Sequence, residues 1–221
     1  MGVISVLWSP VRVLREVAEE RNVLAGFLVV AALAALGTVG STISLLTGSE
    51  TVINPENFPQ LPPEFFEGAS TGAGAAAFTL ISTAIGPFFW WVIVSLILQL
   101  VTRFFGGDGP LSAMFAVLGV AQMPSVVSAL IGLPITALVA VIGPTGTAPL
   151  VLLSISSLIG LIAFVWSVVL IIIGAAQARN IGYGESTGSC AISCAGCFGF
   201  IIGGAVLVVL AVSVISGAAG S

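Results

Sequence analysis

The sequence contains no lysine and no histidine, and Asp108 is its single aspartate. A serine–histidine triad, a serine–lysine dyad, a histidine zinc site and a histidine-ligated haem each need a residue type that is absent. A paired-aspartate intramembrane protease is excluded because a second aspartate is missing. We therefore expect no enzyme activity, no cofactor, and no catalytic, cofactor-binding or metal-binding residues.

Charge of either sign is scarce, with five arginines and nine carboxylates among 221 residues. Only 6% of the residues are charged and 58% are hydrophobic, whereas a soluble domain carries about a quarter charged residues. The mean hydropathy is +1.23. Nothing resembles the clustered basic residues that neutralise phosphates, which excludes a nucleic-acid partner. The composition indicates one domain embedded in a lipid bilayer.

Apolar stretches long enough to cross a membrane recur along the chain. A helix needs about 20 apolar residues to span the hydrocarbon core. No alternating pattern supports a barrel, so the spans must be helical. We predict an all-α, polytopic membrane helix bundle of about five transmembrane helices over residues 23–216, with kinks at Pro87 and Pro124. The predicted spans are 23–46, 75–102, 112–133, 150–174 and 190–215.

The arginines predict the orientation, because cytoplasmic loops carry the excess of basic residues near span ends. Five spans with a cytoplasmic N-terminus place every arginine on the inner side. Residues 47–70 and 134–149 then form outer loops without a basic residue. We expect a multi-pass protein of the cell membrane with its C-terminus outside. The arginines are Arg12, Arg15, Arg21, Arg103 and Arg179.

Residues 1–22 form a cytoplasmic lead-in to the first span. Ser9 and Pro10 are typical of a helix N-cap followed by proline at the first helical position. The face of Val11, Leu14, Val17 and Ala18 is apolar, and charged residues cover the rest. The pattern favours a short amphipathic helix in the headgroup region, with Trp8 at the interface. A solvated lead-in is the alternative.

Three segments together resemble a known family. SPVRVLREVAEERN, from Ser9, precedes the first span; RFFGGDGPLSAMFAVLGVAQMPSVVSAL, from Arg103, follows the second; and WSVVLIIIGAAQARNIGYGES, from Trp166, ends the fourth. In order and spacing they resemble the prokaryotic branch of the Yip domain family, polytopic membrane proteins related to the Rab/Ypt-interacting proteins of eukaryotes. The resemblance implies five helices and no known reaction. The positions that carry it are Pro10 with Arg15 and Glu16, Gly106 with Gly107, Pro124, and Gly174 with Arg179.

Cysteines and glycines near the end of the chain allow several interpretations. Cys190, Cys194 and Cys197 have the spacing of an iron–sulfur motif but open an apolar helix, where they share one face. Close helix packing is the main interpretation, with metal or redox chemistry and lipidation as alternatives. Gly199 with Gly203, and Gly37 with Gly40, also suggest close packing within the bundle or in a dimer.

The predicted spans contain Gln99 and Gln122 but no charge inside. Ion-coupled transporters need ionisable groups in the membrane, so their absence disfavours coupled transport. A glutamine that bonds to a neighbouring helix is the common case, and a passive path for a neutral solute would involve Gln122 beside Pro124. We predict a non-enzymatic membrane scaffold or adaptor that acts through protein or lipid partners. Besides the bilayer, we expect a membrane protein partner or a homo-oligomer. The alternative is a transporter or channel subunit for a small neutral solute.

Overall fold

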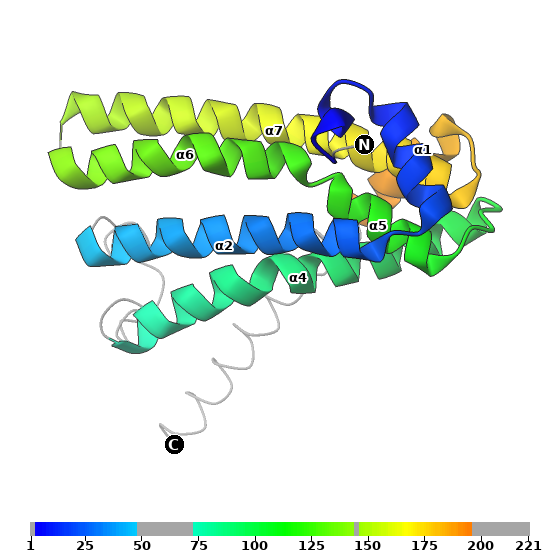
Figure 1. Ribbon diagram of the computed structural model, residues 1–221, viewed down its shortest axis with the longest axis horizontal. Helices are drawn as coiled ribbons and strands as arrows, with labels where there is room; N and C mark the ends of the chain where they lie inside the picture. The colour runs from blue at the N-terminus through cyan, green and yellow to red at the C-terminus, as the bar shows by residue number, and fades with distance from the viewer. Residues whose placement is uncertain (1–2, 48–72, 144–145, 196–221) are drawn as a thin grey trace, which may run out of the picture.

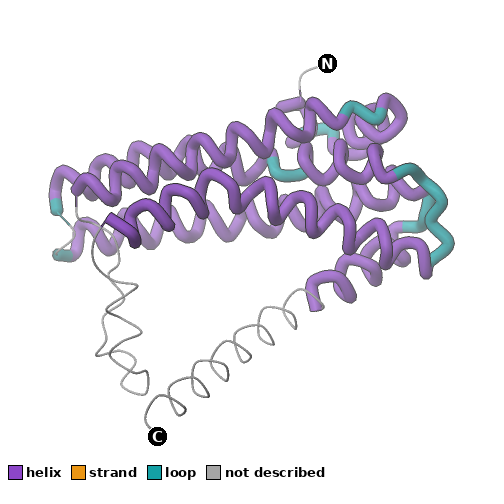
Figure 2. The backbone as a smooth tube through the Cα atoms, turned by 90° about the horizontal axis from the view of Figure 1, so that it is seen from below, coloured by secondary structure: helices purple, strands orange, loops and turns teal. Residues whose placement is uncertain are grey.

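The computed structural model describes residues 3–47, 73–143 and 146–195, and within these residues every regular element is a helix. A short 3-10 helix, η1 (Val3–Leu7), precedes α1 (Pro10–Glu20), which lies across one end of the molecule (Figure 1). The long helices run near the long axis, and most of their connections lie at the two ends (Figure 2). The predicted polytopic helix bundle is therefore confirmed.

Four of the predicted spans are long apolar helical segments in the structure. They are α2 (Val23–Thr47), α4 (Ala73–Phe104), the pair α5 (Leu111–Val120) and α6 (Met123–Ile142), and α7 (Thr147–Arg179). Residues 183–195 form a further helix, and most of the fifth predicted span, 190–215, lies outside the described residues. The outer loop expected over 47–70 also lies almost wholly outside them.

The third span is broken into two helices. Pro124 cannot donate a hydrogen bond to the carbonyl of Val120, and it sits in the first turn of α6. At the break the Gln122 amide donates to the Gly119 carbonyl at 3.1 Å, and the Ser125 amide donates back to Gln122 at 3.0 Å. The chain steps sideways here, so that α5 and α6 are not coaxial (Figure 1). The kink predicted at Pro124 is thus a full interruption, whereas α4 continues through Pro87 as one unbroken helix.

Two helices extend beyond the predicted bounds. The third span was expected to end at 133, before an outer loop over 134–149, but α6 continues through Pro134 to Ile142. The segment after Pro134 is apolar, and helices in lipid tolerate an internal proline. Gly143 at φ +86° ends α6, and α7 begins at Thr147. The fourth span was expected to end at 174, but α7 continues to Arg179 through a run of small residues.

Helix α5 forms the centre of one end of the molecule. It contacts α1, α2, α4 and α7, and residues 116–121 are all buried. Backbones approach closely there: a Cβ on Gly119 would overlap the backbone of Gly26 in α2, and a Cβ on Gly174 in α7 would overlap Val117. Such small residues let helices pack tightly in lipid. The ends of α2 and α4 that lie away from α5 diverge instead (Figure 1).

Candidate functional site at the charged end

Every charged side chain in the described part of the chain lies at the α5 end of the bundle. Helix α1 carries two arginines and three glutamates, and Arg21 joins it to α2. The last turns of α4 and α7 each carry an arginine. The α4–α5 loop and the segment after α7 add one carboxylate each. We call this region the charged end; its charged residues are Arg12, Arg15, Glu16, Glu19, Glu20, Arg21, Arg103, Asp108, Arg179 and Glu185.

One of these charges is buried. Arg179 is only 1% exposed, and its guanidinium reaches from the end of α7 into the α4–α5 loop. Its Nε donates to the Thr102 hydroxyl at 3.1 Å, and its two terminal nitrogens donate to the carbonyls of Gly107 and Gly109. A planar guanidinium suits several fixed acceptors at once. All three acceptors are neutral oxygens, so Arg179 links the ends of α4 and α7 through hydrogen bonds to a loop.

The loop over residues 105–110 is shaped to close around the end of α7. Gly106 has φ +80°, a conformation that L side chains rarely adopt. A Cβ on Gly107 would lie 3.0 Å from Arg179 Nε, and a Cβ on Gly109 would overlap the carbonyl of Ala178. The Asp108 amide donates to the Arg179 carbonyl at 3.3 Å, while the Asp108 carboxylate accepts from Asn180 Nδ2 at 3.5 Å. The glycines are therefore needed for contact with α7.

Helix α1 rests with its apolar face on α5 and α7. Leu14 is fully buried, and Val13, Val17 and Ala18 are buried beside it. Val13 takes the place that the sequence suggested for Val11, which is 37% exposed. Amphipathicity alone could not separate contact with protein from contact with lipid headgroups. Trp8 next to it is 77% exposed, so an aromatic side chain stays free to meet headgroups.

The charged face of α1 points away from the bundle. Arg12, Arg15, Glu19 and Glu20 are exposed. Arg15 Nε donates to Gln177 Oε1 of α7 at 3.2 Å, which adds a polar contact to the apolar seat of the helix. The arrangement presents mixed charges on a helix that is fixed by its buried side.

Gln122 lies at the α5–α6 break, where it lines a cavity of about 260 Å³. Ser125 and Ser167 line the same cavity, with their hydroxyl oxygens 3.3 Å apart. The other intramembrane glutamine, Gln99, donates to the Gly109 carbonyl at 3.4 Å. Gln99 thus bonds to the α4–α5 loop and not to a neighbouring helix.

The first two cysteines line that cavity as well. Cys190 is buried against α4 and α7, and Cys194 is exposed one turn further along the same helix. In the described residues no group of three or more cysteine or acidic side chains could hold a metal ion. Cys197, Gly199 and Gly203 lie outside the described residues.

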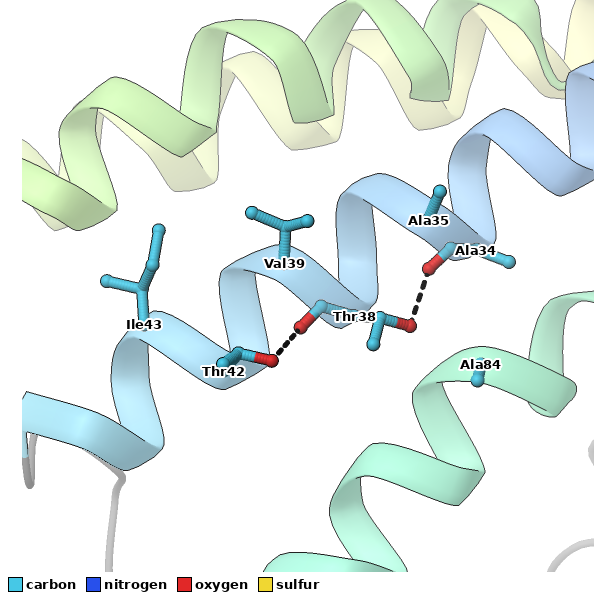
Figure 3. A pocket seen from close by; sticks show the side chains of 7 residues that line it. All are labelled: Ala34, Ala35, Thr38, Val39, Thr42, Ile43 and Ala84. Carbon is cyan, nitrogen blue, oxygen red and sulfur yellow. Dashed lines mark hydrogen bonds between the residues drawn. The ribbon is translucent and has the colours of Figure 1, made fainter.

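A second cavity, of about 480 Å³, opens between α2 and α4 away from the charged end (Figure 3). Its walls are small or apolar, with Ala34 and Ala35 on α2 and Ala84 on α4. The two hydroxyls in it are used locally, since Thr38 donates to the Ala34 carbonyl and Thr42 to the Thr38 carbonyl, each at 2.8 Å. The close packing within the bundle that was expected at Gly37 and Gly40 is not made by the described residues: nothing lies within 4 Å of a Cβ at Gly37, and the nearest atom to one at Gly40 is 3.7 Å away. Gly26 makes the close contact of α2 instead. Packing in a dimer at Gly37 and Gly40 stays a prediction.

The buried role of Arg179 was not predicted from the sequence. Its position after an apolar span suggested only a marker of membrane orientation. The available signal was its place at the end of the small-residue run from Gly174, together with a loop holding Gly106, Gly107 and Gly109. Those two segments carry the resemblance to a family, and the structure brings them into contact.

The family model of the Yip1 domain matches residues 4–205, which takes in all the described α-helices. Among curated proteins, nothing matches the chain. Among solved structures, nothing matches it either.

Proposed function

The chain belongs to the Yip1 domain family and is a multi-pass membrane protein, and from this premise we propose that it is a non-enzymatic scaffold whose charged end engages protein or lipid partners. One observation carries the proposal. Helix α1 is held on the bundle by its buried side, which leaves a mixed-charge helical face exposed. A fixed surface of this kind suits recognition, because little ordering is required on binding. The absence of histidine and lysine supports a role without catalysis.

The same end is the one we propose to face the cytoplasm. All five arginines gather there, as the positive-inside rule favours for inner loops. Helix α7 has 33 residues and is about 50 Å long, whereas the hydrocarbon core is about 30 Å thick. The charged end can therefore project beyond the hydrocarbon while α7 still spans it. This orientation puts the N-terminus inside and, with a fifth span, the C-terminus outside.

A crosslinking experiment in native membranes tests the scaffold proposal. A photo-crosslinking amino acid at Glu19 samples the exposed face of α1. The same amino acid at Leu158, which is 57% exposed on α7, samples the lipid-facing side of the bundle. We expect discrete protein adducts from position 19, to a second copy or to another membrane protein, and lipid adducts from position 158. Lipid adducts alone at both positions would contradict a protein partner, and an absence of adducts at position 19 would contradict the proposal.

A transporter or channel subunit for a small neutral solute is the second candidate. Gln122 favours it, because this uncharged polar side chain lines a cavity inside the bundle. In proteoliposomes, this candidate expects solute flux that Gln122→Leu abolishes. Equal flux from wild type, variant and protein-free liposomes would remove it.

A further inference from the structure

The cavity at the α5–α6 break is built from four separate elements. Helix α4 and helix α7 form its apolar walls, and the helix over residues 183–195 closes one side. Gln122 lies at the break itself, and Ser125 lies in the first turn of α6. The volume of the cavity is about 260 Å³, and none of its lining residues is charged. The interruption between α5 and α6 leaves polar groups at the cavity that a continuous helix inside the membrane would keep bonded.

Several hydrogen-bonding side chains line the cavity. Ser125 and Ser167 approach to 3.3 Å, and Ser167 is only 4% exposed. The Gln122 side chain does not cap α6, so its amide remains available for a ligand. An amide and a hydroxyl pair offer both donors and acceptors. A polar group in a lipid-embedded cavity gains from a partner, because no bulk water competes there.

Other residues that line the cavity are apolar and exposed. Trp90 and Phe164 line it and are 47% and 64% exposed, and Cys194 is exposed beside them. These residues lie on helices whose outer surfaces are apolar and would face lipid. A molecule entering here would therefore come from the bilayer.

We infer that this cavity binds an uncharged, lipid-soluble alcohol, with its hydroxyl at Gln122, Ser125 and Ser167 and its chain along Trp90 and Phe164. A hydroxyl donates and accepts, as these partners require. A charged headgroup is excluded because nothing in the lining could compensate it. The volume holds roughly nine non-hydrogen atoms, taking about 30 Å³ for each as for liquid water. Octan-1-ol has this size, and longer alcohols would extend past the exposed side chains of Trp90 and Phe164.

Photolabelling of the purified full-length protein in lipid nanodiscs tests the inference. The probe is an octanol that carries a diazirine, and adducts are located by peptide mass spectrometry. We expect labelling within the segments that hold Trp90, Phe164 and Cys194. Excess octan-1-ol should prevent it, while octane, which lacks the hydroxyl, and octanoate, which is charged, should not. Competition by octane as strong as by octan-1-ol would overturn the inference, and so would adducts spread evenly over the lipid-facing helices.

Substitutions test whether the polar side chains of the cavity bind the hydroxyl. Gln122→Leu and Ser167→Ala each remove one partner of the hydroxyl and should lower the affinity for octan-1-ol about threefold to tenfold. Ser154→Ala is the matched control, because Ser154 also lies on α7 but is exposed and donates to the Leu150 carbonyl. If Gln122→Leu disturbs the helix break, Ser167→Ala still tests whether the hydroxyl binds at this place. Unchanged affinity in Ser167→Ala would overturn the placement of the hydroxyl.

Thiol reactivity gives a second, independent measurement. Cys194 lines the cavity and is exposed, so octan-1-ol should slow its alkylation by N-ethylmaleimide, while octanoate should leave it unchanged. Equal alkylation rates with and without octan-1-ol would contradict occupation of this cavity. These measurements need no protein partner, and they can fail or succeed independently of the scaffold proposal.

Discussion

The charged end and the opposite half of the bundle are built by different rules. At the charged end α5 is enclosed by four other helices, and a buried arginine joins two of them. In the opposite half α2 and α4 diverge around an open cavity, and Leu46 and Val141 are more than 80% exposed. Exposed apolar side chains are stable in lipid, whereas polar and charged groups must find specific partners. Sequence detail therefore matters most at the charged end.

The largest effect should come from removing the buried charge. Arg179→Met deletes the donor to Thr102, Gly107 and Gly109, and leaves these buried acceptors without it. Each buried acceptor that loses its donor costs about 1–3 kcal/mol, and three acceptors lose theirs here. We expect a large fall in the melting temperature of the purified protein, measured by thermal unfolding in detergent.

Two controls make this result specific. Arg103→Met removes an exposed arginine from the end of α4, and we expect a change within about 0.5 kcal/mol. Arg179→Lys keeps the charge but loses the planar fork, so it should remain clearly less stable than the wild type. Equal melting temperatures for Arg179→Met and Arg103→Met would show that the two arginines are equivalent and that the charged end is not organised around Arg179.

A smaller effect should come from close helix packing. Gly119→Ala places a methyl group on the backbone of Gly26, and such overpacking costs about 1–3 kcal/mol. Gly37→Ala is the matched change in the opposite half, with nothing within 4 Å of the new Cβ. We expect only Gly119→Ala to lower the melting temperature. A comparable loss in Gly37→Ala would mean that a further element packs on this part of α2, and the contrast between the two halves would weaken.

Hydropathy and the positions of the basic residues predicted the features that a lipid bilayer requires. The four described spans and the gathering of the arginines follow from the length of apolar runs and the avoidance of charge in hydrocarbon. Lateral packing is not encoded in those patterns. Pro124 predicted a bend, but not that α5 would become the enclosed centre. Pro134 suggested the start of an outer loop, but α6 continues through it, since neighbouring helices can satisfy a carbonyl freed by proline.

The candidate site was predictable only in its parts. Gln122 was singled out from residue type, but its neighbours in the cavity come from three other helices whose pairing the sequence does not give. Gly37 and Gly40 were expected to pack closely, yet the close contact that the described part of α2 makes within the bundle occurs at Gly26, which the sequence did not single out. The buried role of Arg179 depends on a loop that lies about 70 residues earlier in the chain.

The smallest effect tests the polar contacts between α4 and α5. Trp91 is 8% exposed, and its indole Nε1 donates to the Phe115 carbonyl at 3.0 Å, with the two rings edge to face at 5.3 Å. Trp91→Phe keeps an aromatic ring but removes the donor, so we expect a loss of about 0.5–1.5 kcal/mol. Trp90→Phe changes the adjacent residue, which is 47% exposed, and should shift the melting temperature by less. The two tryptophans are adjacent on α4, so they lie at a similar depth in the membrane. A larger loss of stability at Trp90 than at Trp91 would mean that contacts on the lipid-facing side stabilise the protein more than the contact with α5. That result would reverse the contrast between an enclosed end and an open half.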